Sequence, residues 1–396
     1  MLRHRTLVVV VVCVAFIAAS LGLVLLSSAT PAVHATLLRA DRSCAVPNVK
    51  GRSLSAAKNV LRRKGCRVGA VRRALSNTVA RGLVISQSPH AGTHRPAGAK
   101  VSLVVSKGKP PPSPTVTVAI PAPGTGGVTT GGGAVWATNG DGSISRIDPA
   151  TNEVVAVIQV GPKNFGVAAI SDTDVWLSAP DADALYRINI ATNTVSPPIA
   201  LPSGSTPMGG AIAAGSFWVA LEHAGAVARV DPATNAVTMI PVGSVGPNGP
   251  LAVAESSGDV WVSVPADGKI VRVDPGTNSV MANVSVTQEC TFAATETALW
   301  VGGGCGGTQL ATVDESTNTA SRLADLSPDI VGGPVLLGQT LWLITLNEAL
   351  ARIDTVSGAV TRFTGFKGYN VEGESIAAGF GDLWVRAAGH VLRVKP

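Results

Sequence analysis

The sequence has few charged side chains for its length, with Asp, Glu, Lys and Arg making up only 14% of its 396 residues. Aromatic residues are also scarce, at 4%, whereas 44 Gly and 26 Pro interrupt the chain at short intervals. Such a chain does not favour long surface helices, which need a charged or polar face. It favours many short buried strands joined by tight turns, and it is too long for one average domain.

Acidic residues are nearly missing from residues 37–110, which contain 16 Lys and Arg but one acid, Asp41. Residues 111–396 carry the opposite bias, with 24 Asp and Glu against 13 Lys and Arg. This asymmetry predicts two regions with different partners. In an exported protein we expect the basic region to meet acidic wall polymers or anionic lipid rather than nucleic acid.

Charge is absent from the stretch of 20 residues from Leu7 to Leu26, which follows Arg3 and Arg5. This length suits either the apolar part of an export signal or a membrane-spanning anchor. Small residues around His34 offer a cleavage site. Residues 1–35 are therefore predicted to be a signal peptide or a membrane anchor, and both alternatives stay open.

The sequence has no Cys-x-x-Cys pair, and its six His do not cluster with Cys, so we expect no zinc site. Beyond the export region four cysteines remain, in two local pairs: Cys44 with Cys66, and Cys290 with Cys305. In an oxidising compartment this arrangement predicts one disulfide within each pair.

Residues 44–109 have the pattern of a short strand, a helix and then three strands. Ser53 is predicted to cap the start of the helix and Gly65 to follow its end. The helix has one apolar stripe, made of Leu54, Ala57, Val60 and Leu61. Strands are expected over residues 67–72, 83–86 and 100–105, which together predict a small α+β module.

Three runs of this module resemble the PASTA domain: Val46 to Val49, Val84 to Pro89, and Lys100 to Gly108. The resemblance covers nearly the whole segment. It implies an extracellular module linked to peptidoglycan fragments, of the kind carried by serine/threonine kinases and penicillin-binding proteins.

The catalytic motifs of those two enzyme classes are missing. There is no Gly-rich loop followed by a strand Lys, no His-Arg-Asp or Asp-Phe-Gly, and no set of Ser-x-x-Lys with its partner motifs. The chain is therefore predicted to be neither a kinase nor a transpeptidase. Arg72, Arg73 and Arg81 are candidates for contact with carboxylates or phosphates of the wall, because arginine offers a planar pair of donors. The alternative is that they are ordinary solvated side chains.

Residues 110–114 are Pro-rich and predict an extended linker of the polyproline II type. We expect this linker to separate the basic module from a second domain, residues 115–396.

All seven Trp lie in residues 115–396, at spacings of 39 to 43 residues. An Arg-Ile-Asp or Arg-Val-Asp triplet follows most of them, and a Thr-Asn pair follows five. A period near 41 residues indicates a repeat architecture, and four strand-like runs in each period are typical of a propeller blade. We expect each Trp to pack between blades. They are Trp136, Trp176, Trp218, Trp261, Trp300, Trp342 and Trp384.

The seventh repeat lacks a fourth strand-like run, and residues 115–120 resemble the fourth strand of the first repeat, residues 153–158. We therefore expect residues 115–120 to complete the last blade, which closes the ring and removes sheet edges. The predicted fold is all-β, a seven-bladed β-propeller preceded by a small α+β domain.

The run Val135-Trp136-Ala137, the run from Arg146 to Asn152, and their copies resemble bacterial YVTN/NHL-like propellers, including virginiamycin B lyase. That lyase opens a cyclic ester with His and Glu side chains and a metal on the propeller face. Here the propeller holds only His223 and His390, in different repeats, with no His-x-Glu pair. We therefore expect no enzyme activity, no metal and no cofactor.

Propellers bind ligands with the loops that join successive blades and with those between second and third strands. The candidate ligand-binding residues in these loops are Glu222, His223, Asp267, Lys367 and Tyr369. Glu222 and His223 would form an acid–base pair only if they pointed the same way, and adjacent residues at a strand end point apart. For each residue the alternative is an ordinary exposed polar side chain.

These observations predict an exported, cell-wall-associated binding or scaffold protein that is secreted or membrane-anchored. The basic module is expected to dock on peptidoglycan or another acidic polymer, and the propeller to bind a protein or glycan. Two alternatives remain: a secreted lyase-like enzyme that uses the propeller face, and a sensory ectodomain that acts with a kinase in trans.

Overall fold

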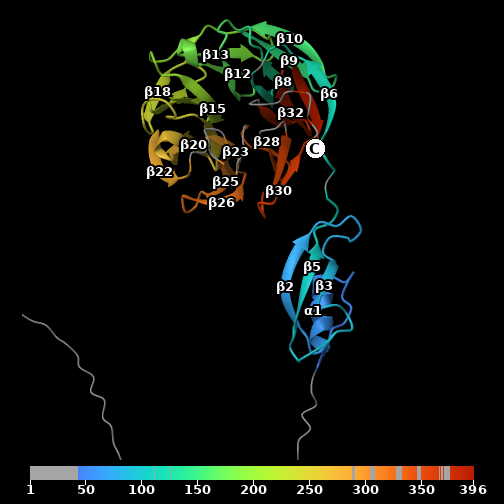
Figure 1. The fold of residues 1–396 in the computed structure, drawn as a ribbon. Coiled ribbons are helices and arrows are strands. Elements are labelled where there is room, and N and C mark those ends of the chain that lie inside the picture. The colour runs from blue at the N-terminus through green and yellow to red at the C-terminus, as the bar shows by residue number, and fades with distance from the viewer. Residues whose placement is uncertain are drawn as a thin grey trace, which may run out of the picture. The chain divides into compact units, whose positions relative to one another are not determined.

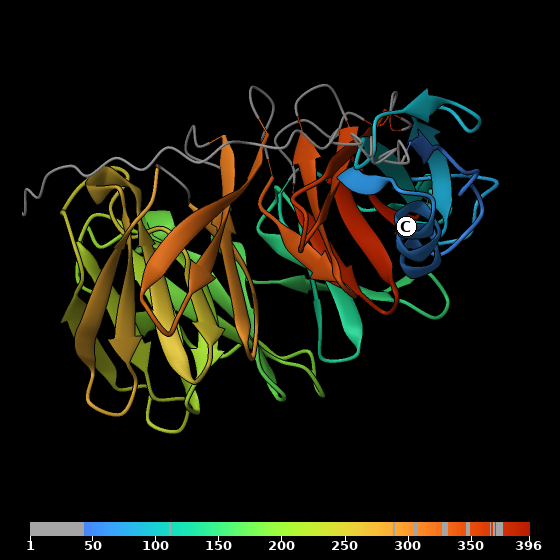
Figure 2. The same cartoon turned by 90° about the horizontal axis from the view of Figure 1, so that it is seen from below.

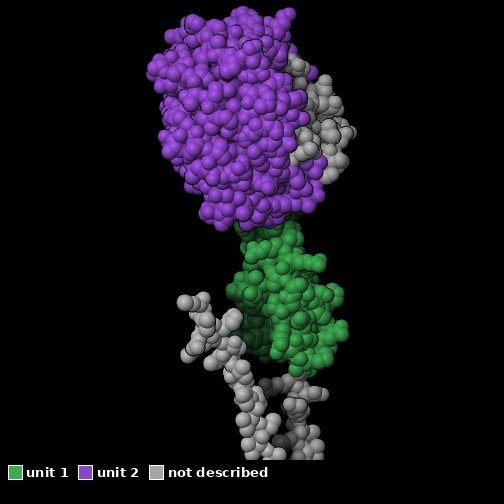
Figure 3. Space-filling view, turned by 90° about the vertical axis from the view of Figure 1, so that its left-hand side faces the viewer, with its two compact units in different colours: residues 1–111 green, residues 112–396 purple. Residues whose placement is uncertain are grey.

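A computed structural model describes residues 43–110, 112–124, 126–287, 290–303, 308–326, 332–345, 349–364, 366, 369 and 375–396. The chain divides into two compact units, residues 1–111 and 112–396, which Figure 3 colours separately. The two units have different architectures.

The small unit packs one helix against a three-stranded sheet. Helix α1 (Leu54–Arg63) begins after Ser53, whose hydroxyl accepts a hydrogen bond from the Ala56 N–H at 3.2 Å. It ends before Gly65, at φ +73°, so the predicted cap and stop are confirmed. Central β5 runs parallel to β2 and antiparallel to β3, and β1 pairs with β4. The strands are β1 (Cys44–Ala45), β2 (Arg67–Ala74), β3 (Val84–Ser88), β4 (His94–Arg95) and β5 (Lys100–Ser106).

Alternation along β5 decides which side of this sheet meets the helix, because successive side chains of a strand point to opposite faces. Val101, Leu103 and Val105 are buried and share one apolar cluster with Ala57 and Leu61 of α1. The residues between them on β5 belong to the other side. The sheet therefore has one face covered by α1 and one open face.

A disulfide joins β1 to the residue that follows the helix. Cys44 and Cys66 are bonded with their Cα atoms 4.8 Å apart, which confirms this predicted pair. Cys290 is also disulfide-bonded, whereas its predicted partner, Cys305, lies outside the described residues.

The large unit consists of four-stranded antiparallel sheets that follow one another in chain order (Figures 1 and 2). Seven such sheets lie within the described residues, and we number them from the N-terminal side. The first sheet comprises β7 (Val128–Gly131), β8 (Ala134–Thr138), β9 (Ser143–Asp148) and β10 (Glu153–Gln159); the second β11 (Gly166–Ile170), β12 (Asp174–Ala179), β13 (Ala184–Asn189) and β14 (Ile199–Ala200); the third β15 (Pro207–Ala213), β16 (Ser216–Leu221), β17 (Ala226–Val230) and β18 (Val237–Pro241).

The later sheets keep the same order of strands. The fourth sheet comprises β19 (Val253–Ser256), β20 (Asp259–Val264), β21 (Lys269–Asp274) and β22 (Ser279–Ser285); the fifth β23 (Thr291–Thr295), β24 (Ala298–Gly302), β25 (Gln309–Asp314) and β26 (Thr319–Asp325); the sixth β27 (Val335–Leu337), β28 (Thr340–Thr345), β29 (Ala349–Asp354) and β30 (Val360–Phe363); the seventh β31 (Ile376–Gly379), β32 (Asp382–Ala387), β33 (His390–Lys395) and β6 (Thr115–Pro121). Short 3-10 helices, η1 (Pro180–Ala182) and η2 (Pro265–Asp267), join β12 to β13 and β20 to β21.

The seventh sheet takes its outer strand from the beginning of the unit. Strand β6 pairs with β33, with Thr115 opposite Lys395 and Pro121 opposite His390, and Figure 1 shows this cyan strand beside the red ones. The predicted completion of the last repeat by residues 115–120 is confirmed. The first strands of successive sheets are neighbours, and β31 also lies beside β7. There the Thr130 hydroxyl donates to the Ala378 carbonyl at 2.8 Å.

A buried arginine holds the connection from β6 to β7. Arg386 on β32 is fully buried and donates to the carbonyls of Pro123, Gly124 and Thr138. A buried guanidinium is tolerated only when acceptors replace its water. Because these acceptors belong to the β6–β7 connection and to the first sheet, Arg386 joins the seventh sheet to the first.

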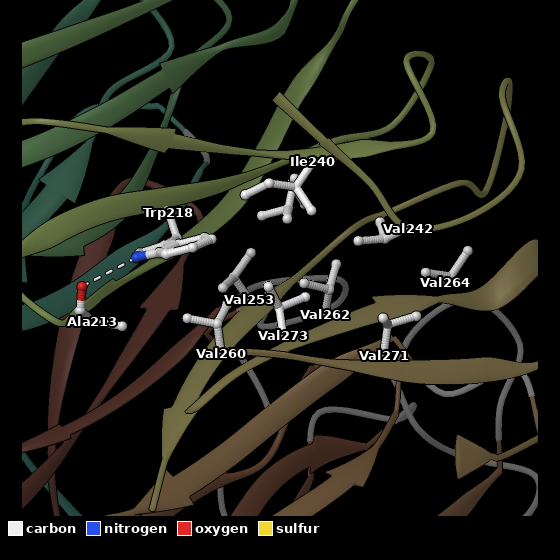
Figure 4. Packing of buried hydrophobic residues seen from close by; sticks show 12 residues of the cluster. Ala213, Trp218, Ile240, Val242, Val253, Val260, Val262, Val264, Val271 and Val273 are labelled. Atoms are coloured by element: carbon white, nitrogen blue, oxygen red, sulfur yellow. Dashed lines mark hydrogen bonds between the residues drawn. The ribbon is translucent and has the colours of Figure 1, made fainter. Parts of the chain in front are cut away.

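Apolar side chains fill the space between neighbouring sheets. In Figure 4, Trp218 of the third sheet shares a cluster with Val253, Val260 and Val273 of the fourth. The Trp218 indole N–H donates to the Ala213 carbonyl of its own sheet at 3.1 Å. The prediction that Trp218 packs between blades is thus confirmed.

Arginines on the third strands connect neighbouring sheets through a contact that we call the arginine clamp. In five sheets the guanidinium carbon lies 4.6–5.3 Å from the ring centroid of the Trp in the same sheet. Its Nη1 donates at 2.5–2.7 Å to a backbone carbonyl in the turn of the next sheet, and at 2.7–3.2 Å to an Asn Oδ1 in that turn. These Asn have φ of +53° to +63°, a region that Asn tolerates. The pairs are Arg146–Asn193, Arg187–Asn235, Arg229–Asn278, Arg272–Asn318 and Arg393–Asn152.

The boundary between the fifth and sixth sheets has neither partner of the clamp. Thr312 stands in place of the arginine and Gly358 in place of the asparagine. Gly358 has φ +66°, and a Cβ there would clash with the Leu323 carbonyl oxygen of the fifth sheet. A close approach of the two backbones therefore takes the place of the clamp.

Removing the acceptor of one clamp is expected to destabilise the large unit. Asn278→Gly keeps the left-handed backbone available but removes the Oδ1 that binds Arg229, so we expect the free energy of unfolding to fall by about 1–2 kcal/mol. Urea unfolding followed by tryptophan fluorescence measures this loss. Combining Asn278→Gly with Arg229→Ala should cost less than the sum of the single changes; strict additivity would mean that the two side chains are not coupled.

Gly358→Ala is expected to lower the free energy of unfolding more than Gly338→Ala does. Both glycines have positive φ, so both substitutions carry a backbone strain of about 1–2 kcal/mol. Nothing lies within 4 Å of a Cβ at Gly338, whereas the Leu323 carbonyl obstructs one at Gly358. Urea unfolding of both variants gives the comparison, and equal losses would show that the boundary relaxes without cost.

Candidate functional site

The open face of the sheet in the small unit carries a shallow groove of about 240 Å³. The strand register places Arg72 and Ser86 on either side of Val104, and Ser88 beside Ser102. Arg72 is the one charged residue among those that line the groove. The floor and rim are formed mainly by Ala70, Arg72, Ser86, Ser88, Ser102 and Val104.

Three serines and a guanidinium suit an anionic ligand that also carries hydroxyl or amide groups. The guanidinium offers a planar pair of donors to a carboxylate or phosphate, and serine hydroxyls both donate and accept. Gln87, in contrast, is committed to the fold. Its side chain donates to the Pro47 carbonyl at 2.9 Å and accepts from the Val49 N–H at 2.8 Å.

The charge of residues 43–110 has no internal compensation. Residues 43–110 contain 14 Lys and Arg and no Asp or Glu. All ion pairs within the described ranges belong to the large unit. The groove therefore lies in a segment of net positive charge, which favours the approach of anions in general.

The three arginines predicted as ligand contacts do not share one face. Arg72 lines the groove, whereas Arg73, opposite Val105, lies on the other side of β2. Arg81 is exposed in the loop between β2 and β3. The groove serines were missed from the sequence, although their alternation in Val84 to Ser88 is a signal for one shared face.

In the large unit, Glu222 and His223 contact different loops. The Glu222 carboxylate accepts from the Asn248 N–H at 2.8 Å, in the connection that leads to the fourth sheet. His223 Nδ1 lies 3.1 Å from the Thr206 hydroxyl, in the connection that comes from the second sheet. The two side chains thus bind to different loops, and no hydrogen bond joins them in the part of the chain that the structure describes.

Asp267 also ties two loops together. Its carboxylate accepts from the Ser244 N–H at 3.2 Å and from the Ser244 hydroxyl, and it pairs with Lys269 at 3.0 Å. The Ser244 hydroxyl lowers the pKa of Asp267 most; burial opposes this and Lys269 adds to it. Asp183, which the sequence did not single out, holds the N–H groups of Gly204 and Thr206 in the same manner.

The two remaining candidates lie elsewhere. Tyr369 packs against the apolar cluster of the sixth and seventh sheets, which contains Trp342 and Phe366. Lys367 lies outside the described residues.

Within the described ranges, no group of three His, Cys, Asp or Glu is arranged to hold a metal ion. No helix in the same ranges has the length and hydrophobicity to cross a membrane. The predicted signal or anchor, residues 1–35, lies outside the part of the chain that the structure describes.

Comparison with known proteins identifies the small unit. Residues 45–107 match the family model of the PASTA domain. The chain is 37% identical over 76 residues to a probable serine/threonine-protein kinase of Clostridium acetobutylicum, and 38% identical over 77 residues to one of Clostridium perfringens. Each match covers 19% of this chain but only 12% and 11% of the kinases. The chain therefore spans only about a tenth of the length of these two kinases.

The large unit shares its fold with solved propellers. A streptogramin B lyase has a TM-score of 0.62 at 16% identity, covering 72% of this chain and 98% of the lyase. Virginiamycin B lyase from Staphylococcus aureus has a TM-score of 0.57 at 15% identity, covering 69% and 95%. The Cps50 (Swd1) β-propeller domain of Myceliophteria thermophila scores 0.61 at 12% identity, covering 72% and 99%. At these identities the likeness concerns the β-propeller fold alone.

Ser244→Ala is expected to raise the pKa of Asp267 toward its ordinary value of 3.8, because the main hydrogen bond to the carboxylate is lost. Since the folded-state pKa is lowered, the carboxylate stabilises the fold above the unfolded-state pKa, and this contribution disappears as pH falls through the lowered value. NMR titration of the Asp267 carboxyl in both proteins measures the shift. An unchanged pKa would mean that Lys269 alone holds the carboxylate ionised.

Proposed function

We propose that this chain is an exported, cell-wall-associated binding protein. Its PASTA domain docks on peptidoglycan or another acidic wall polymer, and its propeller binds a protein or glycan. The observation that carries the proposal is the groove lined by Arg72 and three serines. It lies within residues 43–110, which contain 14 Lys and Arg and no Asp or Glu.

Binding of this kind has a long-range and a short-range part. The net positive charge attracts carboxylates and phosphates over a screening length of about 10 Å at 0.1 M salt. The groove adds directional hydrogen bonds from Arg72 and the serines, which charge alone does not provide. A single PASTA domain has no avidity, so we expect a modest affinity.

For the large unit we propose one closed ring of seven blades, completed by β6. Such a ring presents a rigid set of loops on one face. Glu222, Asp267 and Asp183 are engaged by neighbouring loops, which supports a preorganised binding surface rather than a set of free catalytic groups.

A sensory ectodomain acting with a kinase in trans is the second candidate. Its support is the 37% identity to a segment of a probable serine/threonine-protein kinase. A lyase-like activity rests on fold likeness alone, which does not carry function.

Arg72→Ala is expected to weaken binding of the full-length protein to purified peptidoglycan about tenfold, because it removes charge-assisted hydrogen bonds worth about 1.5 kcal/mol. Co-sedimentation across a series of salt concentrations measures both parts of the interaction. Arg63→Ala is the matched control, since it removes the same charge from the exposed side of α1. We expect Arg63→Ala to change the salt dependence but to reduce binding much less.

Equal losses in the two variants would mean that charge alone drives binding and that the groove has no role. Binding that responds neither to salt nor to Arg72→Ala would contradict the assignment of wall binding to the PASTA domain.

A further inference from the structure

A sixth arginine occupies the clamp position of the sixth sheet. Arg352 on β29 stands directly opposite Trp342 on β28, as Arg229 stands opposite Trp218 in the third sheet. Its guanidinium carbon lies 5.8 Å from the Trp342 centroid and 5.2 Å from that of Phe363 on β30. The cationic half of a clamp is therefore present at the boundary between the sixth and seventh sheets.

The acceptor half is missing there. The five complete clamps bind a carbonyl and an Asn in the turn between the third and fourth strands of the next sheet. In the seventh sheet no such turn joins the third strand to the fourth, because β6 comes from the other end of the unit. No hydrogen bond or ion pair joins Arg352 to any residue that the structure describes. This includes Pro114, which precedes β6, and Pro396, which follows β33, the two residues nearest in sequence to the position of the missing turn.

The surroundings of Arg352 make an external acceptor favourable. Aromatic rings contact the guanidinium but supply no oxygen atoms, and partial burial lowers its pKa by removing water. A partly desolvated cation gains from each acceptor that reaches it. Five equivalent arginines satisfy this requirement with two oxygens on Nη1.

The charge at the end of the third strand also differs between the seventh sheet and the others. Lys395 stands where five of the other sheets have Asp and the second has Asn189. The Lys395 side chain is largely exposed, and its Nζ lies 3.3 Å from Asp382, which also accepts from Arg393. One carboxylate thus serves two cations, while residues 111–396 as a whole carry more acids than bases.

We propose that Arg352 is a binding site for the carboxylate of a peptide ligand, at the boundary between the sixth and seventh sheets. The two carboxylate oxygens take the places of the carbonyl and Asn oxygens of a complete clamp, and the chain preceding the carboxylate packs against Phe363. Carboxylate is the expected class, because it presents two oxygens in one plane and carries the charge that complements Arg352 and Lys395. The site is separate from the groove of the PASTA domain, so either proposal can fail without the other.

The test uses the full-length protein and a peptide that copies the missing turn. The probe is acetylated Pro-Ala-Thr-Asn, the sequence of residues 149–152, with a free C-terminal carboxylate; its C-terminal amide is the paired control. NMR of arginine side-chain N–H groups follows both titrations. We expect the free acid to shift the Arg352 signal and to bind at least tenfold more tightly than the amide.

Arg352→Lys should abolish the preference for the free acid, because lysine keeps the charge but loses the planar pair of donors. Arg322→Lys is the matched control, an exposed arginine paired with Asp325 in the same unit, and should leave the preference unchanged. Equal binding of acid and amide, or no shift at Arg352, would overturn the proposal.

A stability measurement without peptide tests whether the site is vacant in the protein itself. Arg352→Ala leaves no acceptor unpaired among the residues that the structure describes. It should therefore destabilise the protein less than Arg229→Ala, which leaves the Pro275 carbonyl and the Asn278 side chain without their donor. An equal loss of stability would show that the chain already fills the site, and the proposal would be wrong.

Discussion

The contact on which the large unit depends most joins an arginine on the third strand of one sheet to the turn of the next. Each guanidinium lies over a buried Trp of its own sheet and reaches a carbonyl and an Asn in the next sheet, as from Arg229 to Pro275 and Asn278. From Arg393 of the seventh sheet, the next sheet is the first, and the partners are Pro149 and Asn152. A four-stranded sheet of this size cannot bury its apolar face alone. The clamp fixes the neighbour that covers it, and it orients the Trp that fills the space between the two.

The two boundaries without a complete clamp follow from the same geometry. Between the fifth and sixth sheets both partners are replaced, and Gly358 lets the turn approach the Leu323 carbonyl directly. Between the sixth and seventh sheets β6 supplies the outer strand, so the turn that Arg352 would bind does not form. Closing the sheet with a strand from the start of the unit thus leaves one arginine without its usual acceptors. Arg386 provides a different link at the boundary between the seventh and first sheets.

The PASTA domain is basic and the propeller is acidic, and this difference does not follow from the contacts between the sheets of the propeller. The PASTA domain is held by one disulfide, one helix and a small apolar cluster, none of which needs an acidic side chain. Its cations therefore have no acidic partner within residues 43–110, and Arg72 is the one that lines the groove. In the propeller, acids such as Asp267 and Glu222 are used between loops instead.

The sequence by itself determined what is local or periodic. Ser53 caps α1 because its own hydroxyl reaches the first turn, Cys44 and Cys66 are close in the chain and in the fold, and the spacing of seven Trp defines the repeated sheets. Residues 115–120 could be assigned to the last sheet because they share the pattern of other fourth strands.

Only the tertiary structure decided which residues meet across sheet boundaries. The sequence shows the Arg and the Thr-Asn pair as repeated landmarks. It does not show that the Arg of one repeat binds the Asn of the next, as Arg229 binds Asn278. The same holds for the candidate sites, where residues adjacent in the sequence reach different places. Arg72 lines the groove and Arg73 lies on the other side of β2, while Glu222 and His223 contact different loops.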